Sequence, residues 1–149
     1  MKPDQLETFE NQPQPEQRHQ DHINAAMVAL GAMTVAAGYL DSAATAAINA
    51  DTELRLAAAT LDDLKALTLL EALRVGALDG SNKEIRDAQE RGYRAASADW
   101  TEAASAYHDA TVAAARARQK AESAAARFSV AKEGVRLHTS IVALLGRGL

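Results

Sequence analysis

Few residues in this chain have the type and spacing that chemistry requires, and the histidines come first. His19 and His22 lie three positions apart on either side of Asp21, so on a helix these side chains could share a metal ion. His108 lies beside Tyr107 and Asp109. His138 interrupts the apolar seam of the second arm, where a core or interface role is the commoner one. The chain has no cysteine, which excludes disulfides and thiolate-held metals. We expect no bound metal here.

Basic residues are the second candidate for a site, because they gather toward the C-terminus. Residues 1–109 hold 9 Lys/Arg and 18 Asp/Glu, whereas residues 110–149 hold 7 Lys/Arg and 2 Asp/Glu. A basic end on an acidic chain can bind an anion or nucleic acid. Alternatively, it faces an acidic segment of the chain itself, or water. The candidate contacts are Arg116, Arg118, Lys120, Arg127, Lys132 and Arg136. Their spacing does not form one stripe, so any nucleic-acid binding should be weak and salt-sensitive.

Other catalytic patterns are missing from the sequence. It contains no Gly-rich phosphate loop, no nucleophile elbow and no zinc knuckle. We therefore expect a protein that is not an enzyme, with no cofactor and no catalytic residue.

The elements that position these residues are read from one short break, Asp79-Gly80-Ser81-Asn82. Helical patterns of nearly equal length flank it, at residues 21–78 and 82–146. Gly80 is expected to have a positive φ as the C-cap of the first arm. Ser81 or Asn82 should cap the second arm, with Glu84 completing an S-x-x-E box after Ser81. So short a loop makes the arms antiparallel neighbours.

Apolar residues recur along both arms at helical spacing. In the second arm, steps of three and four predict a coiled-coil seam. Its members are Ile85, Ala88, Gly92, Ala96, Trp100, Ala103, Tyr107, Ala110, Ala114, Ala117, Ala121, Ala124, Phe128, Ala131, Val135, His138, Val142 and Leu145. In the first arm, one helical face is predicted to hold Leu54, Leu61, Leu64, Leu67, Leu70 and Leu73.

The seam is rich in alanine, which forms helices well but fills little volume. A hairpin built on it should be marginally stable alone. We therefore expect self-association, through faces lined by Ala25, Ala29, Ala36, Ala121 and Ala125.

The N-terminal part contains two segments that need an interpretation. Residues 1–20 are rich in Gln, Glu and Pro and lack the apolar core of a secretion signal, so we expect a disordered tail before a hairpin domain at 21–149. Residues 23–40 form an 18-residue stretch without formal charge, long enough to span a membrane. Its many small residues and the lack of a basic flank favour a buried helix in a bundle or oligomer instead.

A family resemblance enters at the break. The run LTLLEALRVGALDGSNKEIRDAQ resembles small uncharacterised helical-hairpin proteins of tailed bacteriophages and prophages. Those proteins combine a leucine-rich helix, a G-x-N-x-x-x-R turn and a long Ala/Glu/Arg-rich helix. The matching positions here are Gly80, Asn82 and Arg86. The resemblance implies an accessory role near phage recombination or replication, in the cytoplasm of a bacterial host cell.

These patterns predict an all-α fold, a long antiparallel helical hairpin of coiled-coil type that assembles into a helical bundle. The expected function is that of a non-enzymatic, phage-type accessory protein acting through protein–protein interaction, in DNA metabolism or host interaction. A structural or assembly oligomer of a virion or cell is the alternative, and a small membrane-associated helical protein is a third. We expect a homo-oligomer with a protein partner, ahead of nucleic acid or membrane.

Overall fold

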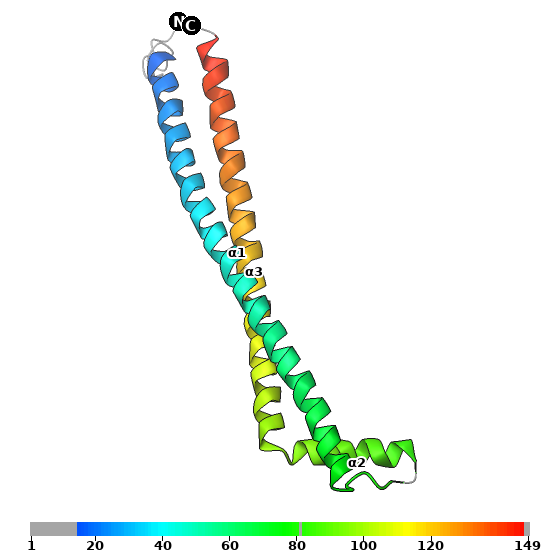
Figure 1. Ribbon diagram of the computed structural model, residues 1–149. Helices are drawn as coiled ribbons and strands as arrows, with labels where there is room; N and C mark the ends of the chain where they lie inside the picture. Colours follow the sequence, from blue (N-terminus) through cyan, green and yellow to red (C-terminus); the bar gives the residue numbers. More distant parts are fainter. Residues whose placement is uncertain (1–14, 81, 148–149) are drawn as a thin grey trace, which may run out of the picture. The chain divides into compact units, whose positions relative to one another are not determined.

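The computed structural model describes residues 15–80 and 82–147, and within them it contains helices and no strand. The helices are α1 (Pro15–Arg74), α2 (Lys83–Ala95) and α3 (Ala98–Gly146), shown in Figure 1. The all-α prediction is confirmed. α1 begins at Pro15, so residues 15–20 belong to the helix and not to the expected tail. The rest of that tail, residues 1–14, lies outside the described residues.

The chain divides into two units by its internal contacts, and α1 packs against α3 in each of them. Unit 1 joins α1 up to Asp41 with α3 from Ser123, and unit 2 covers Ser42–Glu122. In unit 1, a Cβ built on Gly146 would lie 3.8 Å from Cε1 of His19. The start of α1 therefore meets the end of α3, as an antiparallel hairpin requires.

The seam predicted for the second arm is confirmed over most of α3. It is wrong before α3, because Ile85, Ala88, Gly92 and Ala96 are exposed. Ala103, Ala114 and Ala124 are buried, and the seam positions between and after them are half-buried, including Phe128. Tyr107 is the exception, because its side chain is exposed. Steps of three and four keep these positions on one side of the helix, and that side faces α1.

The core that results is thin. The buried apolar side chains of the described residues are the alanines Ala72, Ala103, Ala114 and Ala124, and no large side chain is fully buried. Alanine lets two helices approach closely but removes little apolar area from water. Packing between the helices therefore supplies little stabilisation per turn.

The predicted leucine face of α1 is only half right. Leu54, Leu61 and Leu64 are half-buried in unit 2. However, Leu67, Leu70 and Leu73 are 60%, 63% and 56% exposed, and Thr68 and Ala72 occupy the buried positions instead. The reason is geometric, because a strict step of three drifts around a helix of 3.6 residues per turn. The later leucines have therefore rotated away from the core.

The C-terminus of α1 is closed by Gly76, and not by Gly80 as predicted. Gly76 has a φ of 70°, and no other described glycine has a positive φ. The amide of Ala77 donates to the carbonyl of Ala72 (2.9 Å), and the amide of Gly76 donates to that of Leu73 (3.2 Å). This pair of bonds is a Schellman motif, in which glycine at C′ satisfies the last carbonyls of the helix.

Gly80 instead lets the loop approach α2 closely. A Cβ at this position would lie 2.6 Å from Cγ2 and 2.9 Å from Cβ of Ile85. The amide of Gly80 donates to Oε1 of Gln89 (3.1 Å), and Nε2 of Gln89 donates to Oδ1 of Asp79 (2.5 Å). A single glutamine of α2 thus holds both loop residues.

Asn82 caps α2, as one of the two sequence predictions states. Its Oδ1 accepts a hydrogen bond from the amide of Ile85 at 2.9 Å. Ser81, the other predicted cap, lies outside the described residues. With Asn82 as the cap, Glu84 lies in the first turn of α2, and the exposed Arg86 donates its amide to the Asn82 carbonyl (3.2 Å).

The second arm is interrupted, which corrects the prediction of one continuous helix over residues 82–146. α2 ends at Ala95 and α3 begins at Ala98. Ser97 starts the new helix, because its Oγ accepts from the amide of Trp100 (3.3 Å) and its carbonyl accepts from the amide of Thr101 (3.1 Å). In unit 2, α2 consequently runs in a different direction from α3 (Figure 1).

Candidate interaction surface

The histidines do not form a metal site in the described part of the chain. His19 and His22 are half-buried on the side of α1 that packs against α3. Among the described residues, no three His, Cys, Asp or Glu side chains come close enough together to hold an ion. Nδ1 of His19 and Nδ1 of His138 are buried without a hydrogen-bond partner. The His19 and His138 rings are thus partly enclosed by the packing of α1 and α3.

The six predicted anion contacts are distributed along α3 and are divided between the two units. Three of them, Arg116, Arg118 and Lys120, belong to unit 2, and the other three, Arg127, Lys132 and Arg136, belong to unit 1. All six are exposed.

Two of these cations are paired within the chain. Nη2 of Arg118 lies 2.6 Å from Oδ1 of Asp51 on α1, and Nη1 of Arg136 lies 3.7 Å from Oε2 of Glu133. The Arg118 contact agrees with the alternative from the sequence, in which the basic end faces an acidic residue of the other arm. Such pairing lowers the positive charge that is left for a phosphate.

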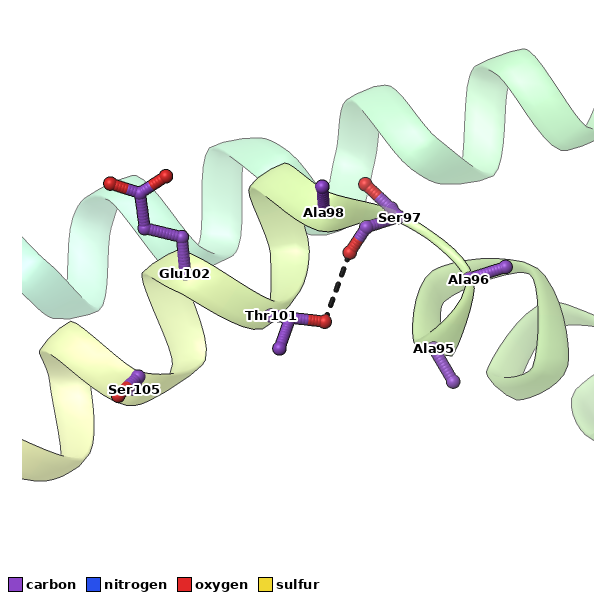
Figure 2. Close-up of a pocket in the computed structure, with 7 residues that line it drawn as sticks. All are labelled: Ala95, Ala96, Ser97, Ala98, Thr101, Glu102 and Ser105. Carbon is purple, nitrogen blue, oxygen red and sulfur yellow. Dashed lines mark hydrogen bonds between the residues drawn. The ribbon is translucent and has the colours of Figure 1, made fainter.

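A shallow open pocket lies where α2 meets α3, and two of its polar side chains already make hydrogen bonds within the chain. Figure 2 shows its lining, which is Ala95, Ala96, Ser97, Ala98, Thr101, Glu102 and Ser105. The hydroxyl of Thr101 donates to the carbonyl of Ser97 at 3.0 Å, and Oγ of Ser97 accepts from the amide of Trp100. The hydroxyls nearest the helix junction thus stabilise the start of α3.

A cluster of three side chains fixes α2 at the same junction. Nη2 of Arg94 lies 2.9 Å from Oε1 of Glu90, and both side chains are largely buried. The guanidinium carbon of Arg94 also lies 5.2 Å from the centre of the Trp100 ring, a cation–π geometry. The Trp100 ring is therefore engaged by Arg94 within the chain. This cluster holds α2 in place.

The exposed apolar side chains are the most unusual feature of unit 2. Leu67, Leu70 and Leu73 lie in the last two turns of α1, and Val75 follows them with 50% of its surface exposed. We call these four residues the leucine face. An exposed ion pair borders it, because Nε of Arg74 donates to Oε2 of Glu71 (2.8 Å). Side-chain hydrogen bonds from Arg74 lower the pKa of the Glu71 carboxyl, so the pair stays charged beside the apolar surface.

Unit 1 also exposes large apolar side chains on both of its helices. α1 is the one helix of the described chain that is long and apolar enough to cross a membrane, with an 18-residue window of mean hydropathy 1.6. No residue of that window is buried. On α3, Val130, Leu137 and Leu144 are exposed and lie seven residues apart.

Most of the alanines predicted to mediate self-association already pack in the contact between α1 and α3. Ala25, Ala29, Ala36 and Ala121 are half-buried between α1 and α3, and only Ala125 is exposed. The apolar surface left for a partner therefore consists of larger side chains on the opposite sides of the helices. The seven-residue spacing of these larger side chains is visible in the sequence and would have predicted a second apolar side on each helix.

Comparisons of the chain with protein-family models, with curated proteins and with solved structures find no match.

Proposed function

We propose that this chain is a non-enzymatic protein that works by binding another protein through the leucine face of unit 2. The observation that carries the proposal is the exposure of the Leu67, Leu70 and Leu73 side chains, which is 56–63%. Contiguous exposed apolar residues with a polar border are typical of protein-binding sites.

The continuous helix that carries the leucine face also favours protein binding. The leucine face lies on a continuous helix that ends in a Schellman motif, so its backbone is ordered before a partner arrives. Little entropy then has to be lost on binding. The partner that suits three leucines at steps of three is an amphipathic helix or a shallow apolar groove.

The resemblance to phage proteins suggests where this binding takes place and with what kind of partner. It supports a partner from phage recombination or replication, or a host protein, met in the cytoplasm of a bacterial cell. A structural or assembly oligomer is the second candidate, and the alanine-only core supports it, because a chain with so thin a core gains stability by association.

The experiment compares two variants as baits in the organism that encodes the chain. Leu67→Gln combined with Leu70→Gln and Leu73→Gln removes the three leucines of the leucine face while keeping helix-forming side chains. The matched control carries Gln at Val130, Leu137 and Leu144, which are exposed on α3. We expect a protein that cross-links to the wild type and to the control but is lost from the leucine-face variant.

Two results would count against the proposal. One is a set of cross-linked proteins that is identical for all three baits. The other is loss of the partner from the control alone, which would move the binding surface to α3.

A further inference from the structure

The outer side of α1 in unit 1 carries a second seam that no described residue covers. Val28 and Val35 are 74% and 60% exposed. Gly31 and Gly38 follow them, so that the four positions are separated by steps of three, four and three. This is the spacing of a coiled-coil seam. The side that packs against α3 is a different one, whose half-buried residues include Ala29, Met33, Ala36 and Leu40. We call Val28, Gly31, Val35 and Gly38 the outer seam.

No contact among the described residues explains why Gly31 and Gly38 lack a side chain. A Cβ built on Gly31 or Gly38 meets nothing within 4 Å, so no neighbouring side chain requires their small size. Both residues lie inside α1, and a helix with glycine at an interior position is less stable than one with alanine there. Close approach of another helix would give both positions a reason to lack a side chain.

The alternation of valine and glycine along the outer seam fits an antiparallel second copy of the same helix. A two-fold axis midway between Gly31 and Val35 places Val28 opposite Gly38 of a second copy, and Val35 opposite its Gly31. Each layer then pairs one valine with one glycine, so knobs meet holes in every layer. A parallel arrangement would instead place valine on valine and glycine on glycine.

We propose that a second copy of this chain docks antiparallel on the outer seam and forms a two-fold symmetric dimer. A two-fold contact uses the same patch on both copies, and the outer seam is complementary to itself. Met27 and Tyr39, each 68% exposed, flank the seam and extend the apolar contact. Residues 23–40 hold no formal charge, so the two copies bring no like charges together. The contact goes beyond the leucine face and involves none of its residues.

The first test fills the glycine positions of the full-length chain. Gly31→Leu with Gly38→Leu should keep or raise helicity, because both positions are open within the chain and leucine is the better helix former. The same variant should abolish the dimer. By analytical ultracentrifugation at micromolar concentration, we expect the wild type at twice the 15.8 kDa monomer mass and the variant at the monomer mass. Gly92→Leu is the control, since Gly92 is exposed in α2 and should leave the dimer intact.

The second test determines the register of the two α1 helices by disulfide cross-linking. The sequence contains no cysteine, so only the introduced cysteines can react. An equimolar mixture of Val28→Cys and Gly38→Cys chains should form a disulfide-linked dimer on oxidation. Val28→Cys alone should not, because the antiparallel register separates the two copies of residue 28 by ten positions, roughly 15 Å along the helix. Efficient cross-linking of Val28→Cys alone would show a parallel pair and overturn the proposal.

Other occupants have their own outcomes. A wild-type chain that stays monomeric at all concentrations, or a leucine-filled variant that still dimerises, rules out the outer seam as the dimer contact. Co-sedimentation of a monomeric wild type with anionic phospholipid vesicles would assign the outer seam to a membrane. The leucine-face variant should dimerise like the wild type, so failure of the partner-binding proposal is distinguishable from failure of this one.

Discussion

At the scale of single residues, two glycines of the α1–α2 loop have different tasks. Gly76 adopts a φ of 70°, where any side chain other than that of glycine is strained. We predict that Gly76→Ala lowers the free energy of unfolding by about 1–2 kcal/mol. Urea unfolding followed by circular dichroism measures it. Gly92→Ala is the control, because Gly92 is helical with open space at its Cβ, and alanine there should stabilise by roughly 0.5–1 kcal/mol.

Gly80 is sensitive to substitution for a steric reason. The added methyl group of Gly80→Ala would meet Cγ2 and Cβ of Ile85, and Cβ is too near the backbone to move freely. We predict a loss of about 1–3 kcal/mol, as for overpacking at a close contact. Combining it with Ile85→Ala should recover part of the loss, because Cγ2 is removed. Equal stability of Gly80→Ala and wild type in the same urea titration would show that the loop does not rest on α2.

Residue-scale predictions from the sequence succeeded where a local rule decides the outcome. Asn82 is a predicted cap because its side chain can accept a hydrogen bond from the backbone amide three residues ahead, and it does so. Asp79-Gly80 is a strong turn signal, which predicts Gly80 as the C-cap. The sequence offers Gly76 as well, and the choice between them depends on where α1 leaves α3, which is a tertiary matter.

At the scale of elements, Ser97 decides where α3 begins. Its Oγ accepts from the amide of Trp100, and a helix without such an acceptor leaves a first-turn donor unpaired. We predict that Ser97→Ala destabilises unit 2 by about 1 kcal/mol, the usual effect of losing an N-cap. Ser105→Ala, at an exposed position inside α3, should be neutral or slightly stabilising. Equal losses from both substitutions in thermal unfolding would argue against the cap.

The break before α3 cannot be predicted from apolar spacing, because that spacing runs through it. Ala96 and Trp100 continue the steps of the seam, so periodicity alone indicates one helix. The cap and the Glu90–Arg94–Trp100 cluster favour the break, and the cluster depends on contacts between elements. The antiparallel pairing of α1 with α3 was predictable, because one turn signal divides two long periodic arms.

At the scale of the whole molecule, the thin core predicts a stability that depends on concentration. Four buried alanines give the described residues little apolar burial, so association should contribute measurably. We predict that the thermal midpoint rises by several degrees between low and high micromolar chain concentration, as mass action requires. Circular dichroism melts over a dilution series check this. The Gly31→Leu, Gly38→Leu variant should show no such rise, and a concentration-independent wild type would contradict the prediction.

The distribution of charge over the molecule leads to the last prediction, which concerns nucleic acid. The chain carries a net charge of −4, and Arg118 and Arg136 are paired with carboxylates. Binding that rests on phosphate contacts loses about 10³–10⁵-fold in affinity between ~50 and ~200 mM salt when 6–10 contacts are made. Because fewer cations are free here and they form no single stripe, we expect weak binding to duplex DNA at low salt and none at physiological salt.

Mobility-shift titrations at the two salt concentrations measure this, with Arg118→Gln as the informative variant. If Arg118 serves its ion pair with Asp51, the substitution should leave the mobility shift unchanged and alter only stability, by less than about 1 kcal/mol for so exposed a pair. A phosphate contact would instead lower the salt slope by nearly one unit. Tight binding that survives physiological salt would place nucleic acid ahead of a protein partner.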